Sequence, residues 1–201
     1  TALFQLAKEL KPCIVTTTTH IGAWQAKEAD QHIIIRKLEE LYQLKEITFS
    51  GAILVTGDEE KKRLTSLPQE SLVWLEQFCN YHSLPLLIEA DGARRKALKA
   101  PKEDEPVIPE FVKTVVVVAG LSALGKVLTD EHIYNVEGFS KLAKLKINEH
   151  ISEENIVNLL KHEIGSLKKI PAKARKIALL NQADTPELQA IGGKIAKKLL
   201  S

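Results

Sequence analysis

The segment LLIEADGARRKALKAP, residues 86–101, runs from an apolar stretch into a sharp change of charge. Residues 86–88 predict a short buried strand, and two carboxylates, Glu89 and Asp91, stand where that strand ends. Gly92 comes next and is followed by a block of cations, which are Arg94, Arg95, Lys96 and Lys99. In α/β folds ligands bind at the carboxyl ends of the strands, so this segment indicates both a fold class and a place for chemistry.

Apolar strands of the same kind alternate with helical patterns along the chain. The predicted strands are residues 12–19, 32–35, 52–56, 86–88, 114–119 and 176–180. The predicted helices are residues 1–11, residues 69–81, residues 152–162 capped by Ser152, and the segment from Pro186 to the end capped by Thr185, while the charged run 58–63 predicts a solvated helix start. Continuous apolar strands separated by helices indicate a mostly parallel sheet covered on both faces. The sequence therefore predicts a single, doubly wound α/β domain over residues 1–201.

The composition excludes several classes of function. The chain has 201 residues, 44% of them hydrophobic, which suits one domain with a full core. A net charge of +2 with mixed signs gives no reason to expect a nucleic acid or a membrane surface as partner. No apolar run approaches the roughly 20 residues that cross a bilayer, and an aromatic content of 5% disfavours a base-stacking platform. Cys13 and Cys79 fit no metal spacing, and we expect reduced thiols in a cytoplasmic protein.

The acidic strand end has the chemistry of a magnesium site. P-loop NTPases hold Mg²⁺ near the phosphates with a carboxylate at the end of a buried strand. Asp91 is placed to reach the metal directly or through water, and Gly92 lets the backbone approach a terminal phosphate. The cations that follow would then face the phosphate or another anion. The alternative is an acidic strand end that begins a solvated loop, and taken alone this segment does not separate the two.

The segment IALLNQADTPEL, residues 177–188, carries a second signal. GTPases read guanine with an Asn-Lys-x-Asp motif at a strand end, and Asn181 and Asp184 have that spacing after a predicted strand. Gln182 replaces the lysine; it would still cover the base but lacks the charge. The alternative is a turn in which Asn181 and Asp184 cap backbone groups. The acidic strand end in the same chain favours the base-reading interpretation, and the choice between GTP and ATP stays open.

The segment GLSALGK, residues 120–126, has the spacing of a phosphate loop but is interpreted as a structured loop. Val127 stands where a serine or threonine should bind Mg²⁺, and the segment follows the acidic strand instead of preceding it. Lys126 remains available to touch a ligand. The histidines show no pair at metal spacing on a helix, which disfavours a zinc or nickel site. His20, at the tip of a threonine-rich strand, is interpreted as a hydrogen-bonded loop residue.

Several blocks resemble the YqeC family. They are VTTTTHI at 15–21, LIEADGARRKALKAP at 87–101 with EPVIP at 105–109, GLSALGKVLTDEH at 120–132, and LLNQAD at 179–184. Members of that family are described as accessory proteins for selenium-dependent molybdenum hydroxylases, linked to selenium cofactor biosynthesis. The family is similar to the P-loop NTPases that mature metallocentres with GTP or ATP. The resemblance therefore implies a P-loop NTPase-like three-layer sandwich.

The resemblance also implies parts that this chain does not contain. The family pattern begins with a strand and a glycine-rich phosphate loop directly before the helix that opens this chain, so Thr1 is expected to be the last residue of that loop. A final strand after the last helix is expected as well. Two departures stand out: Val127 occupies a position where the family has proline, and Asn135 with Val136 replaces a basic residue followed by proline. The second departure puts in doubt any role carried over to that loop.

The leading hypothesis is a magnesium-dependent, nucleotide-binding accessory protein, with GTP or ATP and Mg²⁺ as cofactors and a GTPase or ATPase activity left open. Asp91, with Glu89, would hold Mg²⁺ and support hydrolysis. The phosphates would be lined by Thr1, Thr18, Thr19 and Gly92, the base would be read by Asn181 and Asp184, and an anion would be bound by Arg94, Arg95, Lys96 and Lys99. A molybdenum hydroxylase or its cofactor is the expected partner. The alternatives are a non-hydrolysing carrier of a molybdopterin-type cofactor or anionic selenium-bearing precursor, and a structural partner that docks an acidic surface.

Overall fold

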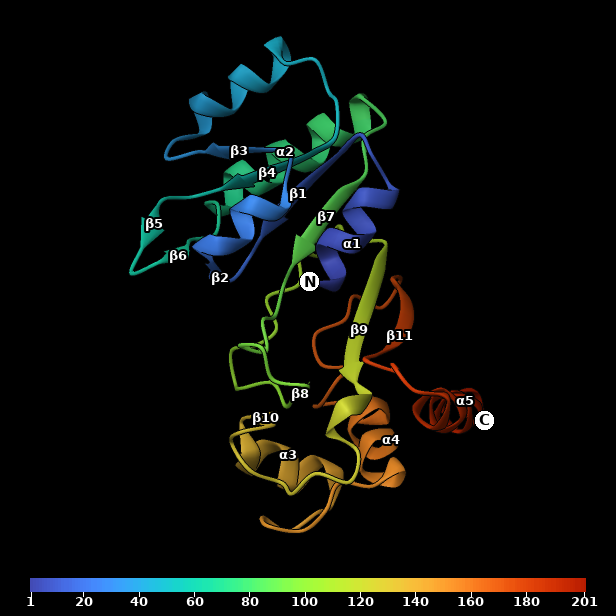
Figure 1. The fold of residues 1–201 in the computed structure, drawn as a ribbon. Coiled ribbons are helices and arrows are strands. Elements are labelled where there is room, and N and C mark those ends of the chain that lie inside the picture. The colour runs from blue at the N-terminus through green and yellow to red at the C-terminus, as the bar shows by residue number, and fades with distance from the viewer. The chain divides into compact units, whose positions relative to one another are not determined.

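The computed structural model describes residues 1–201, which divide into two compact units, Thr1–Gly92 and Ala93–Ser201. We call them unit 1 and unit 2. Each has its own strands and helices (Figure 1). The buried residues of unit 1 form two cores and those of unit 2 form one. The expected single domain stays a prediction, because it concerns how the two units combine. None of the helices is long and apolar enough to cross a membrane.

Unit 1 is built on a parallel sheet. Its strands lie in the order β3-β4-β1-β7, and every pair is parallel. The elements of unit 1 are α1 (Ala2–Glu9), β1 (Cys13–Thr17), β2 (Ile21–Gly22), η1 (Ala23–Glu28), β3 (Gln31–Ile34), η2 (Leu38–Glu46), β4 (Ala52–Thr56), β5 (Glu59–Glu60), β6 (Arg63–Leu64), α2 (Gln69–Tyr81) and β7 (Leu86–Glu89). The predicted mixed α/β fold with mostly parallel strands is confirmed, and α2 has the predicted bounds.

Side chains of β1 alternate between two cores, one on each face of this sheet. Ile14 packs in the core that includes Phe78 of α2 and residues of η2. Its neighbours Cys13 and Val15 pack in the other core, with Phe4 of α1. Because both faces are covered, β1 and β4 are buried along their whole length, as their continuous apolar sequences predict.

The charged run 58–63 forms a hairpin, so the predicted helix start is wrong. Strands β5 and β6 pair antiparallel around Lys61 and Lys62. Both lysines have positive φ, 49° and 63°, which matches the two-residue turn that best fits the twist of a hairpin. Strand β6 also pairs with β2, so the run belongs to a small three-stranded sheet. This long-range pairing with Ile21 and Gly22 is not visible in the local pattern.

Unit 2 contains two pairs of parallel strands packed with helices. Strand β9 (Thr114–Gly120) pairs with β11 (Arg175–Asn181) over seven residues, and β8 (Leu98–Lys99) pairs with β10 (Ile133–Tyr134). The other elements are η3 (Leu121–Ala123), α3 (Val136–Ala143), α4 (Glu153–Lys161) and α5 (Pro186–Leu200). The core of the unit joins these helices to the strand ends through Leu121, Phe139, Ile156 and Ile195.

Strand β9 departs from the expectation that both faces of every strand are covered. Val116 is 40% exposed and Val118 is 47% exposed, whereas Ala119 is buried. Leu179 of β11 is 40% exposed as well. A run of valines is compatible with a strand whether one or both faces are covered, so composition alone did not reveal this difference.

The helix caps of unit 2 agree with the sequence. Ser152 accepts a hydrogen bond from the backbone N–H of Asn155 and so caps α4, and Thr185 accepts one from Leu188 and caps α5. Pro186 occupies the first turn of α5, where its missing N–H costs nothing. The cap at Thr185 starts α5 shortly after Asn181, the last residue of β11.

Candidate functional site

The carboxyl edge of the unit 1 sheet is organised by threonine hydroxyls. Thr16 donates to Val55 O at 2.8 Å, and the Thr17 hydroxyl lies within hydrogen-bond distance of two carbonyl oxygens, Glu89 O at 2.9 Å and Thr19 O at 2.8 Å. Thr16 and Thr17 are fully buried, so they brace the edge and are closed to a ligand. The half-buried Thr18 and Thr19 follow them. Thr18 and Thr19 are thus the threonines after β1 that this edge presents for binding.

Glu89, Asp91 and Gly92 stand at the same edge. The parallel register sets Glu89 opposite Thr17, and Glu89 O accepts from Thr18 N at 3.0 Å. A Cβ built on Gly92 would lie 3.7 Å from Glu89 Oε1, so the Glu89 side chain turns toward the glycine. All three residues are partly exposed. The structure thus brings Thr18, Thr19 and Glu89 together, with Asp91 two residues beyond the strand.

The donor set fits a magnesium ion that keeps water and phosphate ligands. No group of three or more His, Cys, Asp or Glu side chains is arranged as a metal cage. Mg²⁺ is commonly held by one or two carboxylates together with phosphates and water, and it does not need such a cage. Glu89 and Asp91 supply carboxylates of that kind.

Thr1 begins α1 at this same edge. α1 precedes β1 through a short connection, Leu10–Pro12, and runs back against β1 and β7 (Figure 1). Because the connection lies at the amino ends of the strands, the first turn of α1 lies at their carboxyl ends. Thr1 is exposed, its carbonyl accepts from Gln5 N at 3.0 Å, and its side chain makes no capping bond. The hydroxyl of Thr1 is therefore not committed to the helix.

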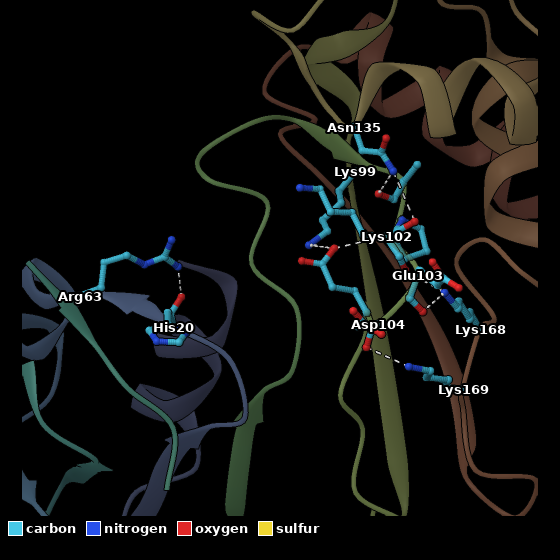
Figure 2. A network of polar contacts seen from close by, with 12 residues as sticks. His20, Arg63, Lys99, Lys102, Glu103, Asp104, Asn135, Lys168 and Lys169 are labelled. Carbon is cyan, nitrogen blue, oxygen red and sulfur yellow. Dashed lines mark hydrogen bonds and ion pairs between the residues drawn. The ribbon is translucent and has the colours of Figure 1, made fainter. Parts of the chain in front are cut away.

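Polar residues that the sequence did not single out complete this edge of unit 1. Arg36 holds Asp58 through two contacts, Nη2 to Oδ1 at 2.9 Å and Nε to Oδ2 at 3.1 Å. Thr56 pairs with His32 Nε2 at 2.9 Å, and burial lowers the pKa of His32. Arg63 donates to His20 O, as Figure 2 shows. Through this carbonyl, His20 is a hydrogen-bonded loop residue, as predicted.

The predicted cations belong to unit 2, where Arg94 and Arg95 form the centre of a tight turn. Arg94 and Arg95 have positive φ, 49° and 65°, and Lys96 N donates to Ala93 O at 2.9 Å across the turn. The Lys96 ammonium donates to Glu131 O at 3.1 Å. Non-glycine residues in this left-handed region are uncommon and often lie at functional sites. Both arginine side chains are exposed.

Three cations surround one aromatic ring in unit 2. Lys99 Nζ lies 4.5 Å from the centre of the Tyr134 ring, and Arg94 Cζ and Lys102 Nζ each lie 5.3 Å from it. Tyr134 is the register partner of Lys99 in the β8–β10 pair. We call these four residues the Tyr134 cluster. Sequence reasoning identified Arg94 and Lys99 but missed Tyr134 and Lys102, because the β10 strand that brings Tyr134 here has only two residues.

Glu105 supplies a carboxylate to the Tyr134 cluster. Its Oε2 lies 2.8 Å from Lys99 Nζ and accepts from the backbone N–H of Lys102 at 3.1 Å. Burial would raise the pKa of Glu105, but the hydrogen bonds from Lys99 and Lys102 and their positive charges outweigh it and lower the pKa. The carboxylate is therefore ionised and occupies a place where anions are favoured.

The loop that carries Glu105 is fastened through its backbone. Lys168 Nζ donates to Lys102 O and Glu103 O, each at 2.7 Å, and Lys169 Nζ donates to Asp104 O at 2.8 Å. On the other side, Asn135 Nδ2 donates to Ala100 O at 3.2 Å and to Pro101 O at 3.4 Å. Figure 2 shows these bonds around the loop. These bonds hold the backbone of residues 100–104, and the Glu105 side chain takes no part in them.

The predicted base-reading residues stand at the end of β11, in unit 2. Asn181 Oδ1 accepts from Gln182 N at 2.8 Å, which fits the bracing role expected of an asparagine here. Gln182 has a φ of 57° and its Oε1 accepts from Ser122 Oγ, so this side chain is tied to the neighbouring loop. Asp184 is exposed and precedes the α5 cap. Asp184 is therefore accessible to a ligand, whereas the side chains of Asn181 and Gln182 form hydrogen bonds within the protein.

The segment 120–126 is a structured loop, as predicted. Leu121 and Ala123 are buried in η3, and Gly125 N donates to Ile151 O at 2.9 Å. The chain continues into an isolated bridge between Val127 and His150, whereas a phosphate loop would lead into a helix. A Cβ on Gly120 would lie 2.8 Å from Ala97 O, so glycine is needed where this strand end meets the chain before β8.

Comparison with known proteins adds the following matches. The sequence profile of the family described as "YqeC protein" matches residues 1–137. A protein of Escherichia coli (strain K12) described as "Uncharacterized protein YqeC" is 33% identical over 97 residues, which are 48% of this chain and 38% of that relative. The matched part thus spans well under half of the relative's length. No solved structure matches the chain.

Proposed function

The chain belongs to the YqeC family, and from that premise we propose that it is a magnesium-dependent nucleotide-binding accessory protein for the maturation of selenium-dependent molybdenum hydroxylases. The carboxyl edge of the parallel sheet in unit 1 carries this proposal. Hydroxyls, carboxylates and a glycine meet there, which is where α/β folds bind ligands. The selenium and molybdenum parts rest on the resemblance described for the sequence.

The finer fold in this proposal is a P-loop NTPase-like three-layer sandwich. Support comes from the four parallel strands of unit 1 and from the cores on both of their faces. The helix α1 lies against β1 and β7 with its first residue at the carboxyl edge. A helix that begins at this edge presents backbone N–H groups to an anion, as the helix after a phosphate loop does.

In this proposal each group at the edge has one task. Asp91 and Glu89 hold Mg²⁺, which would neutralise charge on the phosphates and stabilise the charge that develops in phosphoryl transfer. Thr18 and Thr19 donate hydroxyl hydrogen bonds to phosphate oxygens, and Thr1 does so from the start of α1. Gly92 has no side chain, so a phosphate could approach its backbone closely.

The residues of unit 2 supply recognition in this proposal. Asp184 accepts hydrogen bonds from the base, and Asn181 braces the turn. Arg94, Arg95, Lys96 and Lys99 bind an anionic part of a ligand. Arginine suits that role because its planar guanidinium matches phosphate geometry. Hydrolysis would require an attacking water positioned in line with the terminal phosphate.

A second candidate function is favoured by the Tyr134 cluster. A carrier of a molybdopterin-type cofactor or anionic selenium-bearing precursor would need cations but no hydrolysis. The cluster lies within unit 2, so it does not depend on the carboxylates of unit 1. Binding of such an anion without any effect of Mg²⁺ would favour the carrier.

The test is a fluorescence titration of GTP and ATP analogues into the full-length protein, with and without Mg²⁺. We expect Mg²⁺ to tighten binding in the wild type, and Asp91→Ala to remove most of that effect, an affinity loss of about tenfold. Asp130→Ala is the matched control, because Asp130 is exposed and lies in unit 2. An unchanged Mg²⁺ effect in Asp91→Ala, or no binding of either nucleotide, would contradict the proposal.

A further inference from the structure

The Tyr134 cluster concentrates positive charge in a way that a fold alone does not require. A cation beside an aromatic face is attracted by the negative charge of the ring face. A second and third cation beside the same ring gain less, because they repel one another at these distances. Arg94 and Lys102 are exposed and would be free to separate in water. Their convergence on one ring therefore needs a counter-charge.

In this structure the Glu105 carboxylate supplies a counter-charge to the cluster. One oxygen of its carboxylate receives both an ammonium and a backbone N–H, from Lys99 and Lys102. An ammonium and an N–H directed at one oxygen are the donor set that proteins offer to phosphate. Glu105 thus stands in for an anionic group, with one negative charge where the cluster offers several positive ones.

We propose that the Tyr134 cluster is a binding site for a phosphate-type polyanion, which displaces the Glu105 side chain and binds Lys99, Lys102 and Arg94. The fastening of residues 100–104 makes this displacement local, because Lys168, Lys169 and Asn135 hold the backbone while Glu105 turns away. Pairing in the β8–β10 ladder keeps the ring beside Lys99 before and after binding. The site is thus preformed, and only one side chain has to move.

This inference deepens the anion-binding part of the proposed function and rests on it for the biological source of the phosphate. The chemistry itself needs unit 2 alone. A polyanion bound here would come either from the nucleotide or from a different phosphorylated ligand. The two sources share the same recognition and differ in whether the nucleotide affinity depends on the cluster.

The experiment is isothermal titration calorimetry of the full-length protein with inorganic pyrophosphate, at fixed ionic strength and without Mg²⁺. We expect Lys102→Ala and Arg94→Ala each to weaken binding by about tenfold, since each removes a charged hydrogen-bond donor. Glu105→Gln should tighten binding severalfold, because it removes the competing charge and keeps the shape. Tyr134→Phe keeps the ring and should bind as the wild type does.

Lys45→Ala is the matched control for loss of charge. Lys45 Nζ lies 4.8 Å from the centre of the Tyr42 ring in unit 1, so this variant also removes a lysine from a ring but leaves the Tyr134 cluster intact. It should change pyrophosphate affinity less than twofold. Equal losses in Lys45→Ala and Lys102→Ala would mean non-specific attraction and would overturn the proposal. Absence of pyrophosphate binding, or no tightening in Glu105→Gln, would overturn it as well.

A parallel titration with Mg²⁺–GTP separates this inference from the proposed function. If Lys102→Ala weakens both pyrophosphate and nucleotide, the nucleotide is the source of the phosphate. If it weakens pyrophosphate alone, the source is another phosphorylated ligand. Asp91→Ala should leave pyrophosphate affinity unchanged in the absence of Mg²⁺, so failure of the nucleotide site and failure of the Tyr134 cluster give different results.

Discussion

Asn135 offers the sharpest test of how unit 2 is held together. It has a φ of 62° and a ψ of 67°, its Oδ1 accepts from Gly138 N at 3.2 Å to cap α3, and its Nδ2 donates to Ala100 O and Pro101 O. Asn135→Ala should destabilise the folded state in three ways. Loss of the cap costs about 1 kcal/mol, an alanine in the left-handed region costs about 1 kcal/mol more, and the lost amide donor costs about 1 kcal/mol.

The sum predicts that Asn135→Ala lowers the free energy of unfolding by about 3 kcal/mol. Asn135→Gly is the control, because glycine adopts positive φ freely and loses only a few tenths as an N-cap. It should cost about 1.5 kcal/mol, mainly for the lost donor. The assay is urea unfolding of the full chain followed by far-UV circular dichroism, with hydrogen exchange of the α3 amides to localise the effect. Equal losses in the two variants would refute the account of the left-handed backbone.

Three further predictions concern other parts of the chain. The pKa of Glu105 is lowered from its usual 4.5, so its contribution to stability is present above that value and is lost as the pH falls through the folded pKa. Acid titration of Glu105→Gln should therefore show a flatter loss of stability below about pH 4.5 than the wild type shows. Burial raises the pKa of Cys79 to about 12 and also raises the pKa of Cys13. A thiol reagent at pH 8 should therefore label neither cysteine in the native protein and both cysteines in urea. Rapid labelling of the native protein would contradict their burial. Replacing Lys61-Lys62 with Asn-Gly should stabilise the β5–β6 hairpin by about 1 kcal/mol, measured by thermal unfolding, since both positions have positive φ; destabilisation would mean that the lysine side chains make contacts that matter more than the turn.

The elements that sequence predicted well are those whose signals are local. The α2 helix has its own apolar periodicity, α5 has a threonine cap followed by proline, and β1 and β4 are continuous apolar runs. The α3 helix was missed because it has eight residues and contains Gly138, which lowers its helical propensity. Hairpin residues 58–63 were misread because a charged run suits a helix start and a turn equally well.

The candidate site divides in the same way. The placement of Thr18, Glu89 and Asp91 at one edge of the sheet could be predicted, because strand ends can be read from sequence and parallel strands end at one edge. Tyr134 was missed because the pairing of β8 with β10 joins residues more than thirty positions apart through two residues on each side. Lys102 and Glu105 follow β8 in a charged loop, and the sequence pattern did not single them out. The buried Thr17 has a bracing role that only its register with Glu89 reveals.

The fastening by Lys168 and Lys169 has a consequence for tolerance to mutation. These lysines bind carbonyl oxygens, which every amino acid carries, and they read no side chain of the loop. We therefore expect the side chains at positions 103 and 104 to vary widely without loosening the loop. Replacement of Lys168 or Lys169 should be far less permissive, because Lys168 donates to two of these carbonyls and Lys169 to the third, and a residue without a long donor side chain would leave them unpaired. The residues that hold the loop in place thus lie more than sixty positions away from it in the sequence.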